Sequence, residues 1–452
     1  MSNKTSIQGS WASRWIFILA ATGSAVGLGN IWKFPYITGE NGGGAFVLVY
    51  LACILLVGIP IMMAEVFIGR RARKNPINAL IDVAQESQGP KTWGIIGLIG
   101  MLSGVFIFSF YSVVGGWVLH YIKAMLTGEM QGVTSDQAGA TFSALLADPA
   151  TLLGWHTLFS IMTVMVVAAG INKGIETATR VMMPALFVLL IILLGYAMTT
   201  DGFAQSWNFM FHVDFSKLTW NSALIALGHS FFTLSLGMGT IMAYGSYMTK
   251  TASIGKTVLT IGALDTLVAL VAGLAIFPII FSNGMDPAAG PGLMFISLPV
   301  AFGQMPFGQL FGVLFFVLVG VAAWTSAISL LEPTVAFLVE RFKMKRKSAA
   351  IALGVVVWSL GIACLGSFSF MSDVTLFGKN TFDFLDYITA NIMLPLGGIL
   401  IALFAGWVVK DKFAQEELEL HGAVYSLWRL SMKFTAPIAV AVVLYFLINP
   451  LP

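Results

Sequence analysis

The feature that most constrains this chain is a glycine-rich stretch, Gly23 to Pro35, inside an apolar segment long enough to cross a membrane. In hydrocarbon, backbone amides and carbonyls must be paired, so a helix breaks at membrane depth only where protein or a water-filled cavity surrounds the break. Gly23, Gly27 and Gly29 permit such a break. A break frees carbonyl oxygens for a cation and creates helix ends that hold an ionic substrate. Alone, the glycines are equally typical of close helix packing.

The rest of the chain is apolar as well. Of its 452 residues, 58% are hydrophobic and 10% are charged, and the mean hydropathy is +0.87, which excludes a soluble globular protein. Because a span needs about 20 mostly apolar residues, the sequence predicts an all-α polytopic membrane protein with about eleven spans in a single domain, residues 1–452. We expect these spans near residues 14–36, 44–69, 93–124, 153–170, 180–199, 221–247, 257–281, 309–341, 348–366, 383–409 and 434–450.

Neither processing nor thiol chemistry is indicated. The first apolar stretch has no small-residue cleavage site after it, so we interpret it as a retained span. Cys53 and Cys364 both fall within apolar stretches, which argues against a disulfide framework or a thiolate metal site.

Basic residues predict the orientation, because they gather in cytoplasmic connections. The connections between Lys123 and Lys173 and between Lys256 and Arg341 contain no basic residue. We therefore expect a multi-pass protein of the plasma membrane, the inner membrane of a bacterium, with its amino terminus in the cytoplasm. The predicted cytoplasmic residues are Arg70, Arg71, Arg73, Lys74, Lys91, Lys173, Arg180, Lys250, Lys256, Arg341, Lys343, Lys345, Arg346, Lys347, Lys410, Lys412, Arg429 and Lys433.

A second anomaly follows five spans after the first. The run from Phe231 to Thr240 places two hydroxyl groups and two glycines at mid-membrane depth. Two interrupted segments at corresponding places indicate a transporter made of inverted repeats, with its binding site between the halves. We predict a 5+5 repeat in which helices 1 and 6 are unwound, with a first repeat at about 11–200, a second at about 220–410 and an additional helix at about 434–450.

Two carboxyl groups lie within predicted spans. Glu65 is expected to brace a neighbouring broken helix through hydrogen bonds, unless it only reaches the interface. Asp265 lies in an otherwise apolar run, where an isolated charge costs roughly 2.5 kcal/mol or more. The sequence has no mid-span basic residue except Lys33, so we expect a cation as the partner of Asp265.

Hydroxyl groups in spans three and eight suggest the remaining polar contacts. Ala322, Thr325 and Ser326 share one helix face, which can close a cation site against the carbonyls freed in span one. These hydroxyls equally well bond back to their own helix. Tyr111 needs a hydroxyl partner, which a ligand could supply, and Lys33 and Asp386 form either an opposite-charge pair across an entrance or two solvated charges.

The stretch Gly23 to Pro35, followed by Glu40-Asn41-Gly42-Gly43-Gly44-Ala45-Phe46, resembles the signature of the neurotransmitter:sodium symporter family. Phe231 to Gly239, Trp324-Thr325-Ser326 and the number of spans extend this resemblance over essentially the whole chain. The resemblance implies two sodium ions bound beside one substrate, in the inverted-repeat architecture with a midplane site.

The resemblance also implies the residues of the site. Sodium 1 would take Ala25, Asn30, Thr233, Asp265 and the carboxylate of the substrate. Sodium 2 would take Gly23, Val26, Ala322, Thr325 and Ser326. The substrate would contact Ser24, Ala25, Leu28, Gly29, Ile107, Tyr111, Phe232, Thr233, Ser235, Met238, Ser326 and Leu330. The gates would include Lys33, Asp386, Tyr111, Phe232, Trp11, Tyr247 and Glu340.

Single positions narrow the substrate and the ions. Relatives that carry amines place an aspartate where this chain has Gly27, so its ligand must bring its own carboxylate, as an amino acid does. Asp265 would supply the negative charge that chloride gives animal relatives, and His229 stands near the chloride position in place of glutamine. The resemblance thus implies transport without chloride.

Three positions depart from the family pattern. Lys33 replaces the usual arginine of the outer gate and cannot form a bidentate fork with Asp386. Gln8 replaces the arginine that commonly pairs with the acid at Glu340, so we expect Lys4 or Arg14 to substitute. A twelfth span found in many relatives is absent from the prediction.

We therefore predict a sodium-coupled symporter of neutral hydrophobic amino acids, aliphatic or aromatic, that works by alternating access in the lipid bilayer. The alternatives are a proton-coupled or proton-antiporting amino-acid transporter and, from another class, an ion channel. Enzyme motifs such as His-Glu-x-x-His and Gly-x-Ser-x-Gly do not occur, and we expect neither catalysis nor a nucleic-acid partner. The sequence leaves the preferred amino acid and the oligomeric state open.

Overall fold

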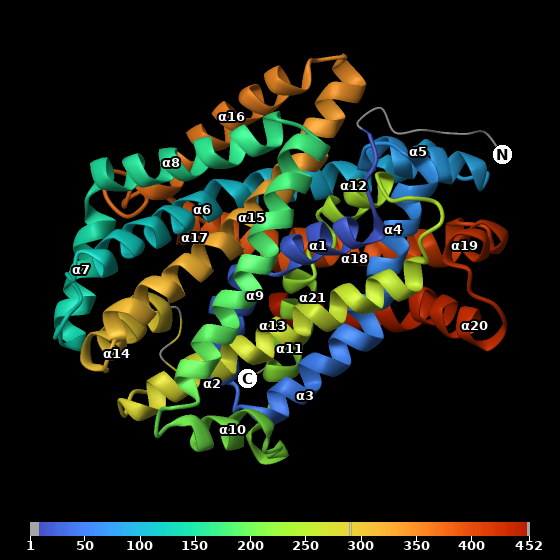
Figure 1. Ribbon diagram of the computed structural model, residues 1–452. Coiled ribbons are helices and arrows are strands. Elements are labelled where there is room, and N and C mark those ends of the chain that lie inside the picture. The colour runs from blue at the N-terminus through green and yellow to red at the C-terminus, as the bar shows by residue number, and fades with distance from the viewer. Residues whose placement is uncertain (1–8, 289, 291, 450–452) are drawn as a thin grey trace.

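The computed structural model describes residues 9–288, 290 and 292–449, and these form a bundle of helices (Figure 1). The first half contains α1 (Arg14–Ala25), α2 (Phe34–Glu40), α3 (Gly44–Cys53), α4 (Ile59–Ala72), α5 (Pro76–Glu86), α6 (Gly94–Leu126), α7 (Ser135–Ala147), α8 (Pro149–Ala168), α9 (Thr177–Ala197), α10 (Phe203–Phe211) and α11 (Trp220–Thr233). The second half contains α12 (Thr240–Ser246), α13 (Ile254–Ser282), α14 (Leu298–Gln304), α15 (Gly308–Phe342), α16 (Arg346–Gly366), α17 (Thr381–Tyr387), α18 (Leu394–Leu403), α19 (Asp411–Leu418), α20 (Gly422–Leu430) and α21 (Ala436–Ile448).

Short turns that are wider or tighter than an α-helix join several of these helices, and one small antiparallel hairpin lies in a connection. The turns are η1 (Gly29–Lys33), η2 (Ile54–Gly58), η3 (Lys91–Trp93), η4 (Ile171–Glu176), η5 (Phe215–Lys217), η6 (Leu293–Ser297), η7 (Ile388–Met393), η8 (Phe404–Val408) and η9 (Ser431–Thr435). The hairpin pairs β1 (Thr375–Leu376) with β2 (Lys379–Asn380).

The long apolar helices agree with the predicted spans. Over the described part of the chain, nine helices are long and apolar enough to cross a membrane, and the bent pair α1–α2 is a tenth. The pair α11 and α12 occupies the remaining predicted span, near 221–247, and each member is too short to cross alone. Large apolar side chains such as Ile191 and Ile438 are exposed on the outer surface of the bundle, as lipid contact requires.

The last span begins earlier than the predicted residue 434. The continuous apolar helix runs from Gly422 to Phe446, because α20 passes through η9 directly into α21. Arg429 and Lys433 made this region look like a polar connection. In the structure, the Arg429 guanidinium donates to the carbonyls of Ala405 and Val409, and the Lys433 ammonium lies 5.0 Å from the Trp407 ring centroid. Both charges are thus satisfied within the helix packing.

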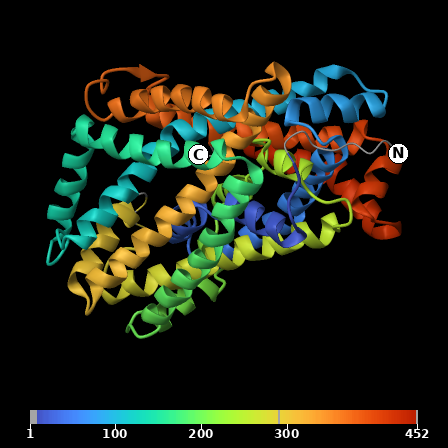
Figure 2. The same ribbon diagram turned by 45° about the horizontal axis from the view of Figure 1, so that its top comes forward.

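Four helices lie in connections where the sequence predicted none: α5, α7, α10 and α19. Figure 1 places α5 and α19 at one end of the bundle and α7 and α14 at the other. Figure 2, turned by 45°, shows the same long helices packed side by side. At the end near α5, Arg70 pairs with Glu417 of α19 at 2.8 Å, and Arg71 pairs with Glu86 of α5 at 2.7 Å. The division into two repeats and the orientation in the membrane stay predictions.

Glu65 braces a broken helix, as predicted. Its Oε1 atom accepts a hydrogen bond of 2.8 Å from the backbone amide of Gly237, which lies between α11 and α12. Both groups are buried, so the carboxyl group satisfies an amide that has no helical partner.

We expect Glu65→Leu to lower the free energy of unfolding by about 1–3 kcal/mol, because it leaves the Gly237 amide without an acceptor in a buried place. Glu65→Gln keeps an acceptor oxygen and should lose much less. Denaturant unfolding of the purified protein measures both variants. Equal stability of Glu65→Leu and the unaltered protein would contradict the role of this carboxyl group.

Candidate functional site

The first break lies between α1 and η1, at residues 26–28. Val26 has extended backbone angles (φ −73°, ψ 102°), and α2 continues at 50° to α1. Gly23 itself stays helical. A Cβ atom there would lie 2.9 Å from the Met183 sulfur and 3.3 Å from the Thr325 Cβ, so this glycine serves close packing. Of the two explanations for the glycines, packing therefore holds at Gly23 and the break lies three to five residues later.

The second break separates α11 from α12 and lies against the first. Ser235, Gly237 and Gly239 all have left-handed backbone angles, with φ of 55°, 78° and 75°. A Cβ at Gly237 would also lie 2.5 Å from the Leu394 carbonyl oxygen, so glycine is required there on two grounds. The Ser235 hydroxyl donates to the Ser24 carbonyl at 2.9 Å, which ties the two breaks together.

A cluster of oxygen-bearing side chains surrounds Asp265 on α13. Asn30 donates to its Oδ1 atom at 2.7 Å, and the Thr233 hydroxyl donates to the same oxygen at 3.0 Å. The Asn30 side-chain oxygen accepts from the Gly27 amide at 3.1 Å. Asp265 and Asn30 are fully buried and Thr233 is 1% exposed. Three of the four protein positions predicted for sodium 1 thus meet, while Ala25 lines the adjacent cavity.

Ser326 of α15 faces the carbonyl groups at the end of α1. Its hydroxyl oxygen lies 3.4 Å from the carbonyl oxygens of both Gly23 and Val26. Thr325 instead donates to the carbonyl of Ala322 in its own helix, at 3.0 Å. The two alternatives for this face therefore apply to one residue each, and all five positions predicted for sodium 2 lie at this junction.

A small cavity of about 30 Å³ lies between the two breaks, α6 and α15. Every residue predicted to contact the substrate lines it except Thr233, which lies behind it in the Asp265 cluster. Its volume holds only one or two water molecules, so a larger molecule enters only if the walls move apart. The lining residues are Ser24, Ala25, Gly27, Leu28, Gly29, Ile107, Tyr111, Phe232, Ser235, Met238, Ser326, Ser329 and Leu330.

Sequence reasoning missed Ser329 in this wall. Its hydroxyl lies 2.8 Å from the Ser24 hydroxyl and donates to the Ser326 carbonyl at 2.7 Å. The position continues the face of Ser326, three residues further along the helix, and this spacing was the available signal. Gly27 lines the same cavity, and a Cβ there would overlap the Ser326 hydroxyl and lie 3.0 Å from the Tyr111 hydroxyl.

Aromatic side chains separate this central cavity from a second one of about 70 Å³. Tyr111, Phe232 and Leu28 line both, and the Tyr111 hydroxyl accepts from the Leu28 amide at 3.3 Å. Lys33 and Asp386, predicted as a pair, both line the second cavity. Over the described residues no ion pair within 4.0 Å joins them. The Lys33 ammonium lies 4.8 Å from the Phe232 ring centroid instead.

The other end of α1 is closed by contacts that the sequence did not predict. Trp11 donates from its backbone amide to the Tyr247 carbonyl and from its indole to the Tyr244 carbonyl, both at 3.0 Å. The Tyr247 hydroxyl donates to Glu332 at 2.8 Å, and Glu332, fully buried, forms an ion pair with Arg346. A carboxylate and an arginine fourteen residues apart give no recognisable local pattern.

The predicted partner of Glu340 is wrong for Arg14, and Lys4 and Gln8 lie outside the described residues. Glu340 accepts two hydrogen bonds from the Asn75 amide, at 3.0 and 3.1 Å, and a third from the Asn75 side chain. Arg14 donates to the Thr257 hydroxyl at 2.9 Å. Asn75 precedes α5, a helix that the sequence reading did not predict, so this partner was not foreseeable.

Comparison with known proteins gives a consistent result over the whole chain. The model of the sodium:neurotransmitter symporter family matches residues 8–141 and 147–451. The chain belongs to this family. It is therefore a sodium-dependent transporter and a multi-pass membrane protein, and not an enzyme, as the sequence predicted.

Relatives in the sodium:neurotransmitter symporter family include both uncharacterized and structurally known members. The chain is 40% identical to the sodium-dependent transporter YhdH of Bacillus subtilis and covers 99% of both chains. A sodium-dependent transporter of Haemophilus influenzae is 35% identical, with 96% of each chain covered. The crystal structure of MhsT in complex with L-phenylalanine is 44% identical, with a TM-score of 0.89 over 97% of this chain and 99% of that one.

We expect Arg346→Met to lower the free energy of unfolding by about 3–5 kcal/mol, because it leaves the Glu332 carboxylate buried without its cation. Adding Glu332→Gln to that variant removes the unpaired charge and should recover part of the loss. Denaturant unfolding of both variants, with exposed Arg341→Met on the same helix α15 as control, measures the effect. A double variant no more stable than Arg346→Met would contradict a charge-pair role.

Proposed function

We propose that this protein is a symporter that couples sodium ions to the uptake of neutral hydrophobic amino acids. The observation that carries the proposal is the single cavity between two helix breaks, with oxygen donors at one side and apolar side chains at the other. The L-phenylalanine bound to MhsT, at 44% identity, supports an amino acid as the substrate. Sodium and the amino acid are both cargo in this proposal.

The first sodium ion would bind at the Asp265 cluster. Asn30, Thr233 and Asp265 supply an amide oxygen, a hydroxyl and a carboxylate, which are ligands that hard cations prefer. Ala25 would add its carbonyl, and the substrate carboxylate would complete the shell. A cation there would also compensate the Asp265 charge, for which the described residues offer hydrogen bonds but no ion pair.

The second sodium ion would bind between α1 and α15. The carbonyls of Gly23, Val26 and Ala322 and the hydroxyls of Thr325 and Ser326 are all neutral oxygen donors close to one junction. A cation at this junction would hold the end of α1 against α15. Its release would free that end to move, which links ion occupancy to access.

The amino acid would lie with its charged groups toward the breaks. Its carboxylate would contact Tyr111, the amides near Gly29 and the first sodium ion, and its ammonium the carbonyls around Ala25, Phe232 and Ser235. The apolar wall opposite would take its side chain, and this wall excludes charged side chains because it offers them no partner. That wall consists of Ile107, Phe232, Met238 and Leu330.

Access would alternate between two sides of this site. Phe232 and Tyr111 would close the outer side, together with Lys33 and Asp386. Trp11, Tyr247 and Glu340 would close the cytoplasmic side, where we place the amino terminus. Both ions and the amino acid would favour the closed state, and this shared preference couples their movement.

Binding of labelled L-phenylalanine to the purified protein tests the proposal. We expect binding in sodium chloride and loss of binding when choline replaces sodium, since the ion supplies a contact to the carboxylate. Competition by each of the other amino acids then ranks the substrates. Binding that is equal with and without sodium, in a protein whose unfolding curve is unchanged, would refute sodium coupling.

We expect uptake into proteoliposomes to continue when gluconate replaces chloride, because Asp265 supplies a fixed negative charge beside the first sodium ion. Asp265→Asn removes that charge and should make uptake depend on chloride. Sodium-driven uptake of labelled L-phenylalanine, in both anions, measures this. Uptake by the unaltered protein that collapses in gluconate would overturn chloride independence.

We expect Ser326→Ala to raise the sodium concentration for half-maximal binding by about tenfold or more, because it removes one neutral donor from the second ion, a contact worth about 1.5–3 kcal/mol. The matched control is Ser359→Ala on α16, an exposed serine that bonds to the Val355 carbonyl of its own helix at 2.9 Å. Sodium titrations of amino-acid binding compare the two. Equal sodium affinities in the two variants would remove Ser326 from the site.

A further inference from the structure

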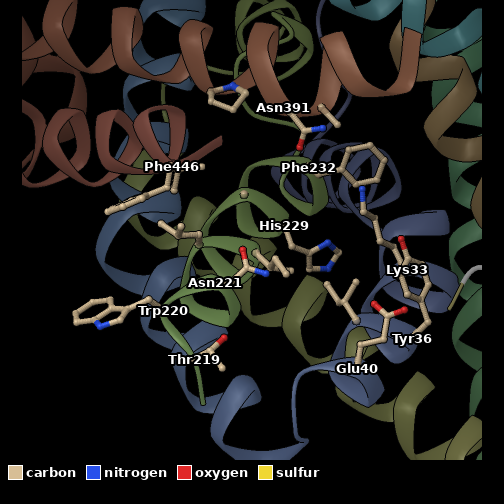
Figure 3. Close-up of a pocket in the computed structure, with 17 residues that line it drawn as sticks. Lys33, Tyr36, Glu40, Thr219, Trp220, Asn221, His229, Phe232, Asn391 and Phe446 are labelled. Atoms are coloured by element: carbon tan, nitrogen blue, oxygen red, sulfur yellow. The ribbon is translucent and has the colours of Figure 1, made fainter. Parts of the chain in front are cut away.

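A third cavity, of about 970 Å³, lies beside the outer gate and is not part of the central site (Figure 3). It is bounded by α2, α11, the region from η7 to α18, and α21. It shares only Phe232 with the central cavity. Ligand pockets in proteins occupy about 300–1,000 Å³, so this cavity is large enough for a molecule well beyond one amino acid.

His229 contributes a buried polar group to the cavity wall. Its side chain is 3% exposed, and neither ring nitrogen has a hydrogen-bond partner over the described residues. The ring packs between Phe34 and Tyr50, with centroids 6.1 and 5.5 Å away. A buried polar group without a partner costs about 1–3 kcal/mol, so a ligand that bonds to His229 would recover this energy.

Charge at the same end of the cavity favours an anion. Lys33 lines the cavity, is half-buried and forms no ion pair with a described residue. Glu40, the acidic residue of the wall, is exposed and therefore hydrated. Figure 3 shows His229, Lys33 and Tyr36 on one side of the cavity and Trp220 and Phe446 on the other. The cavity thus has a cationic, hydrogen-bonding end and an aromatic end.

Gly228 marks open space between these ends. It lines the cavity on α11, one residue before His229, and no atom lies within 4 Å of a Cβ atom built there. A larger side chain at this position therefore fills the cavity without a clash. Leu224, one turn earlier on α11, and Val443 of α21 continue the apolar wall toward Trp220.

We propose that this cavity binds an apolar, ring-bearing carboxylate larger than the transported amino acid, with the carboxylate at Lys33 and His229 and the rings against Trp220 and Phe446. The ligand binds while the central cavity is occupied, since the two cavities share only one side chain. This second site goes beyond transport itself, and its test does not depend on which amino acid is carried.

Naphthylacetate is the probe for this site, and naphthylacetamide and naphthylethylamine are its neutral and cationic counterparts with the same rings. Equilibrium binding is measured on the purified protein in sodium with saturating L-phenylalanine. We expect the carboxylate to bind about tenfold or more tightly than the amide, and the amine to bind no better than the amide. Equal affinities for the carboxylate and the amide would overturn the proposal.

Two variants locate the bound probe. Gly228→Leu fills the cavity and should weaken naphthylacetate about tenfold or more. Gly195→Leu on α9, where an added Cβ also meets no atom within 4 Å, is the matched control and should stay within about twofold. His229→Phe keeps the ring packing, removes both nitrogens and should also weaken the carboxylate. An unchanged affinity in Gly228→Leu would overturn the site.

Sodium-dependent binding of L-phenylalanine to the same samples separates this proposal from the proposed transport. Gly228→Leu should leave that binding within about twofold, since the variant lies outside the central cavity. Loss of phenylalanine binding in the unaltered protein would count against amino-acid transport and leave the naphthylacetate result standing. Loss of naphthylacetate binding alone would refute only the second site.

Discussion

The structure depends on one constraint, the need to satisfy backbone groups that two helix breaks set free in the middle of a membrane bundle. Each freed group that the contacts account for is met by a side chain from another helix. Glu65 of α4 accepts from the Gly237 amide, the Ser235 hydroxyl donates to the Ser24 carbonyl, and Ser326 of α15 faces the carbonyls at the end of α1. These cross-helix bonds make the breaks stable, and they also gather oxygen atoms in one place.

The same contacts explain why such a site responds to ions. A serine hydroxyl 3.2–3.4 Å from three carbonyl oxygens holds them weakly, because one hydrogen serves three acceptors. A cation attracts all these oxygens at once, so it stabilises this junction more than the hydroxyl alone does. Around Asp265 the argument is stronger, because a buried carboxylate with neutral partners gains more from a nearby positive charge than from another hydrogen bond.

The sequence predicted those parts of the site that obey a local rule. Glycines and hydroxyls at mid-span revealed both breaks, a lone carboxyl group revealed Asp265, and helical spacing placed Thr325 and Ser326 on one face. The lining of the central cavity came from a family resemblance, and it agrees at each position but Thr233. The chain could not reveal pairings between distant segments. Glu332 with Arg346 and Glu340 with Asn75 depend on how helices pack, and helix α5 was not predicted at all.

Lys33 shows how one substitution changes the character of the outer end. An arginine would offer a planar fork to Asp386 and form two parallel bonds, whereas a lysine ammonium is a point charge on a flexible stem. Here that charge lies over the Phe232 ring, a contact worth about 0.5–2 kcal/mol, and the ring belongs to all three cavities. Any movement of Phe232 that opens the central cavity therefore moves the seat of the lysine charge as well. Closure at this end rests on the packing of Phe232 and Tyr111 more than on an ion pair, and the cation follows the aromatic ring.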